Sequence, residues 1–496
     1  MFELGDEKMS KAYIIGTGPG DEELLTVKAV NALKKCTAVL YDRLVSNNIL
    51  NYLNDDCIVY YCGKEPGAHY KTQEQINEIL VKLAKEGHIV GRVKGGDPYV
   101  FGRGGEEVLA LEKENIPFEV IPGVTSPIAV LNYAGIPITH RGIAQSFHIV
   151  TGMSANKLNV NFKALAMEEG TLVFMMGLSN LDNIREQLII NGKDSETPCA
   201  VVMRGTCSKQ RKVVGTLNNI TEKVKKAGLK SPCIIVVGEV VKLNEKLNWY
   251  ENKPLFGKNI CITRSQKQGE SLRQKLRELG AEVTSMSAIE IKSTAQNLDE
   301  YINKIEQFDH IVFTSVNSVN IFFDYLIEKR YDIRRIRAQI SVIGKATERS
   351  LQKRGIMCAI KAHEFMGEKL VEAMKSHINS GDKVLIPCSS IAKEEVAEGL
   401  RKAGAEVSRV FIYDTVKGII RNPKAFEEVD IVFFTSPSTV YNMVDMVGLD
   451  MLKNKHVIAI GKKTNEHLKK LGINADVCKE HSEEGFLKEI VEMISK

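Results

Sequence analysis

The stretch VKGGDPYVFGRGGEE (Val93–Glu107) holds five glycines, two cations and three acids within fifteen residues. Glycine-rich loops of this kind often hold a phosphate. Here Asp97 directly follows Gly95 and Gly96, which places a carboxylate where a phosphate would want only N–H groups and cations. The segment therefore favours a ligand that carries positive charge.

S-adenosylmethionine, with its ammonium and sulfonium groups, is such a ligand, and close approach of the backbone would explain the paired glycines. Arg103, between Gly102 and Gly104, would then point at an anionic co-substrate. A second interpretation stays open from this stretch alone, namely a glycine-rich surface hairpin whose charges lie in water.

A second glycine motif, IGTGPGDEELLTVKA (Ile15–Ala29), follows a predicted strand and precedes a predicted helix, so it is a candidate dinucleotide site. The spacing G-x-G-x-x-G is absent, and Pro19 occupies the turn. The acids Asp21–Glu23 would repel a pyrophosphate at the helix start. Together with the absence of a G-x-x-x-x-G-K-[ST] motif, this excludes the usual nucleotide loops.

Length and composition limit the number of folding units and the classes of protein that remain. A chain of 496 residues with 44% hydrophobic residues predicts about three or four folding units. The net charge of +5 gives no case for nucleic-acid binding. The apolar runs are too short to span a bilayer, the N-terminus lacks a secretory signal, and the ten cysteines form no C-x-x-C pair. We expect a cytoplasmic protein with buried thiols, no membrane contact and a disordered extension over residues 1–8.

The polar segment KLNEKLNWYENKPLFGKN (Lys242–Asn259) marks the main boundary. Before it, predicted strands and helices alternate, which indicates an α/β fold with a largely parallel sheet. The expected domains are residues 9–242, with subdomains meeting at about 132/133, a linker over 243–254, and residues 255–496.

The region after the linker repeats itself. ITRSQKQGESLRQKLRELGAEV (Ile262–Val283) matches IPCSSIAKEEVAEGLRKAGAEV (Ile386–Val407), VFTSVNSVNIF (Val312–Phe322) matches FFTSPSTVYNM (Phe433–Met443), and VIGKATERSLQKRGI (Val342–Ile356) matches AIGKKTNEHLKKLGI (Ala459–Ile473). We expect two copies of one α/β lobe. Strands in each repeat run into Thr, Ser, Gly or Lys before a helix, and such turns suit either carboxylate binding or simple helix capping.

The glycine motifs, with VIPGVTSPIAV (Val120–Val130), GIPITHR (Gly135–Arg141), TLVFMMGL, RGTCSKQRKVVGTL and SPCIIVVGEVV, resemble the tetrapyrrole methylase family, and within it the uroporphyrinogen-III C-methyltransferases. The resemblance covers about Ser10–Lys242. The duplicated region, about Leu255–Lys496, resembles the uroporphyrinogen-III synthases, whose fold is two similar α/β lobes. The whole chain looks like a natural fusion of these consecutive enzymes.

The resemblance implies that S-adenosylmethionine lies in a cleft between two α/β subdomains and leaves as S-adenosylhomocysteine, with no metal. The residues that it places around this cofactor are Pro19, Gly95, Gly96, Asp97, Val100, Thr125, Ser126, Met176 and Gly205. Ser126 stands where many relatives have Ala, and Met175 where many have Tyr.

The family's proposed base corresponds to Asp42 and its proposed acid to Lys64. Carbon methylation needs alignment, exclusion of water and a carboxylate that takes a proton from the pyrrole system. Asp42 beside Arg43 is also consistent with a structural ion pair, and Lys64 with simple pairing to a substrate carboxylate.

The family substrate is a cyclic tetrapyrrole with carboxylates around its ring, which gives four arginines a common purpose: Arg43, Arg92, Arg103 and Arg141. In the synthase region the resemblance implies closure of linear hydroxymethylbilane, with inversion of the last ring and loss of water. Tyr413 matches a tyrosine thought to assist departure of the hydroxyl, although it is also a good strand residue. The side chains expected to bind substrate carboxylates there are Thr263, Thr314, Ser315, Thr435 and Ser436.

The resemblance thus implies two methylations that give precorrin-2, for cobalamin or sirohaem, in a homodimer formed through the methylase region. Two alternatives are a different methylase of the same family, and a methylase regulated by duplicated lobes that only sense a ligand.

Overall fold

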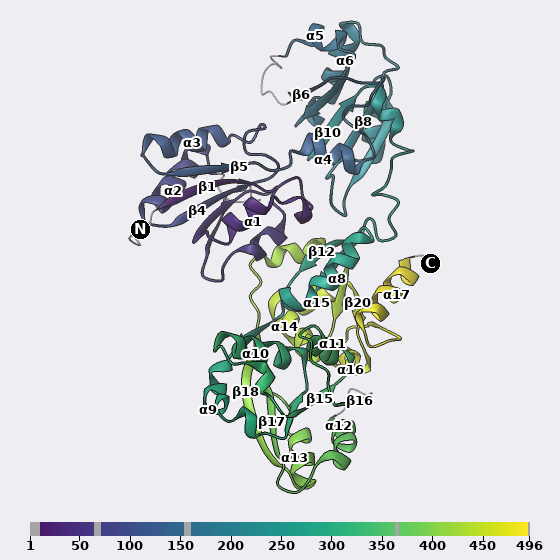
Figure 1. Ribbon diagram of the computed structural model, residues 1–496. Coiled ribbons are helices and arrows are strands. Elements are labelled where there is room, and N and C mark those ends of the chain that lie inside the picture. The colour runs from purple at the N-terminus through teal and green to yellow at the C-terminus, as the bar shows by residue number, and fades with distance from the viewer. Residues whose placement is uncertain (1–9, 64–70, 153–159, 363–366, 495–496) are drawn as a thin grey trace. The chain divides into compact units, whose positions relative to one another are not determined.

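A computed structural model describes residues 10–63, 71–152, 160–362 and 367–494. Four β-sheets with flanking helices are present in these residues (Figure 1), which confirms the α/β class. The chain divides into two compact units, residues 1–286 with 420–496, and residues 287–419. The extension expected over residues 1–8 lies outside the described residues.

The first sheet has the strand order β3-β2-β4-β1-β5, and every pairing is parallel, as expected. Tyr13 and Ile15 point to the face covered by helix α1, whereas Ala12 and Ile14 point to the face covered by α2 and α3. Strands buried on both faces need apolar residues throughout. The elements are β1 (Lys11–Gly16), α1 (Val27–Leu33), β2 (Ala38–Tyr41), β3 (Ile58–Tyr61), α2 (Gln73–Lys85), β4 (Ile89–Lys94), α3 (Gly104–Lys113) and β5 (Phe118–Ile121).

The second sheet has the order β6-β7-β10-β8-β9, and only the β6–β7 pair is parallel. The prediction of a largely parallel sheet is therefore wrong for this second sheet. The loop that joins β8 to β9 is too short to hold the crossover that a parallel pair would require. The elements are α4 (Ser126–Tyr133), β6 (Phe147–Thr151), α5 (Phe162–Met167), β7 (Thr171–Met175), α6 (Leu181–Ile190), β8 (Pro198–Met203), β9 (Arg211–Thr216), α7 (Ile220–Ala227) and β10 (Cys233–Val237).

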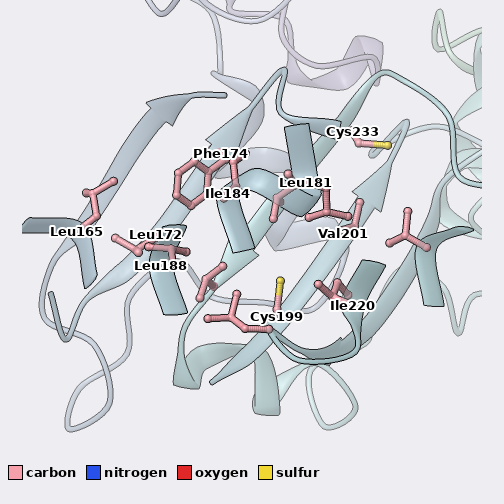
Figure 2. Packing of buried hydrophobic residues seen from close by; sticks show 14 of the residues in the cluster. Leu165, Leu172, Phe174, Leu181, Ile184, Leu188, Cys199, Val201, Ile220 and Cys233 are labelled. Atoms are coloured by element: carbon pink, nitrogen blue, oxygen red, sulfur yellow. The ribbon is translucent and has the colours of Figure 1, made fainter. Parts of the chain in front are cut away.

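Helices cover both faces of this second sheet. On one face, Phe174 and Cys199 of the strands pack against Leu181 and Ile184 of α6 (Figure 2). On the other face, Val130 and its neighbours in α4 pack against the strands. Helix α4 thus begins at the edge of the first sheet and ends in the core of the second.

The segment expected to be a linker, residues 243–254, packs against the end of α4. The rings of Trp249 and Tyr250 contact Tyr133, and Trp249 Nε1 donates to the Asn132 carbonyl at 3.1 Å. Glu251 accepts from Gln210 at 2.9 Å. These residues are therefore part of a packed aromatic cluster.

The third sheet has the order β12-β11-β19-β20-β21, and the fourth has β13-β18-β17-β14-β15-β16. The elements of the third are β11 (Asn259–Ile262), α8 (Gln266–Glu278), β12 (Glu282–Ser285), β19 (Ile431–Phe434), α14 (Pro437–Val447), α15 (Leu449–Lys453), β20 (His456–Ala459), α16 (Lys462–Lys470), β21 (Asp476–Val477) and α17 (Glu483–Ile494). The elements of the fourth are β13 (Ile289–Ser293), α9 (Asp299–Ile302), β14 (His310–Phe313), α10 (Val316–Glu328), β15 (Gln339–Ile343), α11 (Lys345–Gln352), β16 (Ile360–Ala362), α12 (Gly367–Met374), β17 (Lys383–Ser389), α13 (Glu395–Lys402) and β18 (Glu406–Lys417).

The sequence repeat and the sheets do not coincide. Strands β11 and β12 of the first repeat share a sheet with β19 and β20 of the second through the β11–β19 pair, and β14 and β15 of the first share a sheet with β17 and β18 of the second through the β14–β17 pair. Each lobe therefore contains parts of both repeats, in the same spatial order. The chain enters the second unit at Ser287 and leaves it after Ile419. No helix within the described ranges combines the length and apolar character that a membrane crossing would need.

Candidate active sites

Three loops meet at the carboxyl edge of the first sheet, where β1, β4 and β5 end. A Cβ added to Gly16 would lie 2.5 Å from the Gly123 nitrogen, and one added to Gly123 would lie 2.2 Å from the Gly96 carbonyl oxygen. Gly96 also has a φ of +68°, which glycine adopts without strain. The three backbones thus form a tight cradle at the edge where α/β sheets usually bind ligands.

Asp97 joins two of these loops. Its Oδ1 accepts from the Tyr99 nitrogen at 2.8 Å, and its Oδ2 accepts from the Gly123 nitrogen at 3.1 Å. Val100 lies in the same turn, and its nitrogen donates to the Asp97 carbonyl at 3.3 Å. A carboxylate has lone pairs beyond the two used here, so the fixed negative charge fits a cationic methyl donor against the glycine backbone.

Helix α4 brings the next expected cofactor residues to this cradle. Thr125 is its N-cap, and the Thr125 side chain makes no capping hydrogen bond. A Cβ on Gly96 would lie 3.8 Å from the Ser126 nitrogen, and a Cβ on Gly205 would lie 2.4 Å from Val130 Cγ1. The α4 start is therefore next to Gly96, and its second turn is next to Gly205.

The backbone is strained where β7 and β8 end. Met176 has a φ of 56°, and Arg204 and Thr206, on either side of Gly205, have 46° and 70°. Residues other than glycine rarely adopt this conformation, and such outliers gather at functional sites. Met176 is 40% exposed, and Pro19 is half-buried in the loop after β1.

Asp42 directly follows β2 and is held from the neighbouring strand β4. Its Oδ2 accepts from Arg92 Nη2 at 2.6 Å, and Arg92 Nε donates to Glu107 of α3 at 2.7 Å. The Arg92 side chain is 2% exposed, against 31% for Asp42. Burial opposes the charge of Arg92, but Glu107 and Asp42 outweigh it and raise its pKa.

This geometry changes the role expected for Arg92. Its guanidinium is enclosed and donates to two carboxylates. The predicted contact of Arg92 with a substrate carboxylate is therefore wrong, and its contact is with Asp42, which it positions. The other three arginines, Arg43, Arg103 and Arg141, are exposed. Arg103 Nη2 lies 2.7 Å from Oε2 of Glu106, and the Arg103 backbone has a φ of 58°. Lys64 lies outside the described residues.

In the second unit, Tyr413 of β18 reaches the start of α10. Its hydroxyl lies 3.0 Å from the hydroxyl of Ser315, the N-cap of that helix, and Ser315 Oγ accepts from the Ser318 nitrogen at 3.1 Å. Burial raises the pKa of Tyr413. Thr314 is half-buried beside this pair.

The equivalent turn in the third sheet contains Thr435 and Ser436, both half-buried, with Ser436 as the N-cap of α14. Thr263 differs from the expectation that it binds a substrate carboxylate. It is fully buried, and its hydroxyl donates to the Phe433 carbonyl at 3.0 Å. This hydroxyl therefore links the end of β11 to β19.

Glu107 and Lys94 were not among the predicted site residues. Glu107 accepts from Arg92, from Lys94 at 3.0 Å and from Gln73 at 3.2 Å. The signal was present, since Arg92 and Lys94 stand two residues apart in an otherwise apolar strand, and buried cations need buried partners. In the part of the chain that the structure describes, no group of three or more His, Cys, Asp or Glu is placed to hold a metal ion.

Two family models match the chain. The model of the tetrapyrrole (corrin/porphyrin) methylases matches residues 11–221, and that of uroporphyrinogen-III synthase HemD matches residues 270–488. A porphyrin biosynthesis protein HemD from Ruminiclostridium josui is 36% identical over 490 residues, which covers 97% of each chain. The chain belongs to this family of fused tetrapyrrole enzymes.

A further relative agrees with the assignment of the methylase half. A uroporphyrinogen-III C-methyltransferase of Bacillus subtilis is 40% identical over 348 residues, covering 70% of this chain and 72% of that protein. The solved uroporphyrin-III C-methyltransferase of Thermus thermophilus is 39% identical and covers 47% of this chain and 99% of its own, with a TM-score of 0.41. The chain is an enzyme with C-methyltransferase and uroporphyrinogen-III synthase halves. A methylase fused to a mere ligand sensor is not favoured.

Proposed function

We propose that this enzyme carries out two consecutive steps. The synthase half closes hydroxymethylbilane to uroporphyrinogen III with inversion of the last ring, and the methylase half then methylates that product at two ring carbons to give precorrin-2. The observation that carries the proposal is the glycine cradle beside Asp97 at the carboxyl edge of a parallel sheet, in a chain that also holds the Tyr413–Ser315 pair.

In the methylase half, Asp42 is the proposed base. Arg92 occupies Oδ2, so Oδ1 remains to accept a proton from the pyrrole ring as the carbon–carbon bond forms. When bound, S-adenosylmethionine supplies the electrophilic methyl group. Pro19, Gly95, Gly96, Asp97, Val100, Thr125, Ser126, Met176 and Gly205 would hold it, and Arg43, Arg103 and Arg141 would pair with substrate carboxylates. Lys64 remains the proposed acid.

In the synthase half, Tyr413 is proposed to donate a hydrogen bond to the departing hydroxyl of hydroxymethylbilane. The Ser315 hydroxyl fixes the direction of the Tyr413 hydroxyl, and burial favours its protonated form. Thr314, Ser315, Thr435 and Ser436 stand at helix starts, where N–H groups and hydroxyls suit carboxylates.

A single incubation tests both steps. The purified chain receives hydroxymethylbilane and S-adenosylmethionine, with no separate synthase. Methylated type III product supports the proposal. Mass spectrometry should show two added methyl groups per tetrapyrrole. Unmethylated uroporphyrinogen I alone would mean that the ring closed spontaneously and that the synthase assignment is wrong.

We further propose a homodimer through the methylase half and a cytoplasmic location. The ten cysteines are all free thiols, which suits a reducing compartment. Light scattering of the whole chain and of a variant lacking residues 255–496 would test the dimer, since both should form dimers.

A further inference from the structure

Glu107 is fully buried, and its two carboxylate oxygens differ. Oε1 accepts three hydrogen bonds, from Arg92 at 2.7 Å, Lys94 at 3.0 Å and Gln73 at 3.2 Å. Oε2 is enclosed and has no hydrogen-bond partner. Leaving a buried charged oxygen unpaired is costly, so a carboxylate at this position needs a specific reason.

The cluster connects this interior carboxylate to the proposed base. Arg92 uses Nε for Glu107 and Nη2 for Asp42, so it bridges a carboxylate with no exposure and one that is 31% exposed. Lys94 Nζ lies 3.0 Å from Glu107 and 4.0 Å from Asp42. The charges of the two cations balance those of the two carboxylates. Lys94 lies closer to Glu107 than to Asp42, and Arg92 bridges the two carboxylates.

The way in which Arg92 approaches Asp42 matters for the reaction. An arginine facing a single carboxylate tends to bind both oxygens at once. Here Glu107 holds Nε, and Arg92 touches Asp42 only at Oδ2. Oδ1 is therefore left for another donor.

We propose that Glu107 is a positioning residue for the methylation, which holds Arg92 to a one-oxygen contact with Asp42 and thereby keeps Oδ1 open for the substrate proton. This inference rests on the role of Asp42 given under the proposed function. Without the charge of Glu107, Arg92 turns onto Asp42 and occupies both of its oxygens.

Glu107→Gln tests the inference, because the amide keeps the shape and removes the charge. We expect kcat for methylation to fall at least about tenfold, a part of what a general base supplies. The KM for uroporphyrinogen III and the affinity for S-adenosylhomocysteine should change less than about threefold, since neither ligand touches Glu107. The matched control is Glu114→Gln, which removes an exposed ion pair with Lys85 and should leave kcat unchanged.

The double variant with Asp42→Asn separates positioning from simple structure. If Glu107 acts through Asp42, adding Glu107→Gln to Asp42→Asn should not lower kcat further. A full additional loss in the double variant, or an unchanged kcat in folded Glu107→Gln beside an impaired Asp42→Asn, would overturn the inference alone. Full activity of Asp42→Asn would overturn the base itself. Should Glu107→Gln not fold, Glu107→Asp retains the charge but shortens the reach, and should lower kcat in the same direction.

Discussion

The hydroxyl of Tyr413 lies 3.0 Å from the hydroxyl of Ser315, whereas no tyrosine is bonded to Ser436, the matching N-cap, among the residues that the structure describes. The matched segments align Ser315 with Ser436, and continuing the match of Ile262–Val283 with Ile386–Val407 in the same register sets Ile289 against Tyr413. Ser436 Oγ instead lies 2.9 Å from the Ser438 hydroxyl. The two matching turns thus differ in one phenol, which fits the catalytic role proposed for Tyr413.

Tyr413→Phe should lower the rate of enzymatic ring closure at least about tenfold, because the departing hydroxyl loses a positioned donor. The measurement is the ratio of uroporphyrinogen III to uroporphyrinogen I after a timed reaction. Tyr325→Phe, which removes an exposed hydroxyl bonded to Asp299, is the control. A Tyr413→Phe enzyme with full activity and an unchanged melting temperature would end the catalytic assignment.

Arg103→Ala should raise the KM for the tetrapyrrole about tenfold, which corresponds to the loss of one charge-assisted hydrogen bond to a carboxylate. The affinity for S-adenosylhomocysteine, measured by calorimetry, should change less than about twofold. Arg334→Ala removes another exposed arginine, from the synthase half, and should change neither value. Equal losses for both ligands of the methylase would count against Arg103 as a substrate contact.

Gly123→Ala should abolish measurable binding of S-adenosylhomocysteine, because the new methyl group would meet the Gly96 carbonyl oxygen at 2.2 Å and force the cradle apart. Overpacking of this kind costs about 1–3 kcal/mol in stability. Gly105→Ala is the control, since nothing lies within 4 Å of its added Cβ and the residue is helical. That variant should be slightly more stable, by up to about 1 kcal/mol. Thermal unfolding and calorimetry of both variants make the comparison.

Alkaline pH should weaken the fold through the buried thiols. Burial raises the pKa of Cys36 to about 12 and that of Cys57 to about 11, from the ordinary thiol value of 9.0. Above pH 9 the unfolded chain loses thiol protons that the native state keeps. The contribution of these thiols to the free energy of unfolding is therefore fully present below pH 9 and is lost as the pH rises towards 11 and 12. At pH 10 the loss should be about 1 kcal/mol for Cys36.

The measurement is urea unfolding at pH 7.5 and pH 10, with and without Cys36→Ala. The substitution should reduce the difference between the free energies of unfolding at pH 7.5 and pH 10, even though it lowers stability at both. An identical pH dependence in the variant would contradict the burial effect at Cys36.

Much of the candidate methylase site was predictable because its constraints are local. Gly95, Gly96 and Asp97 stand together in one turn, and the need for close backbone approach can be inferred from the glycines alone. Asp42 was predicted only through family resemblance, since one carboxylate after a strand has many explanations. The partners of Arg92 could not be predicted, because Glu107 lies on a helix and meets Arg92 only after the sheet has formed.

The antiparallel pairings of the second sheet and the mixing of the two repeats were also missed. Strand direction depends on connections as much as on apolar runs, and the short β8–β9 loop was the available sign. Sequence similarity between Ile262–Val283 and Ile386–Val407 shows that a unit was duplicated, but it does not show which copies share a sheet.

The exchange of strands between the repeats bears on how this half of the protein arose and how it can be divided. One repeat contains a strand for each place in the shared order, because β14 and β15 are the equivalents of β19 and β20, so an unduplicated ancestor could have formed the sheet within one molecule. In the duplicated chain the two copies have exchanged halves, as in domain swapping, within a single polypeptide. A cut between the repeats should therefore yield two fragments that rebuild the native sheets only when mixed, whereas excision at Ser287 and Ile419 would release a piece with an intact core.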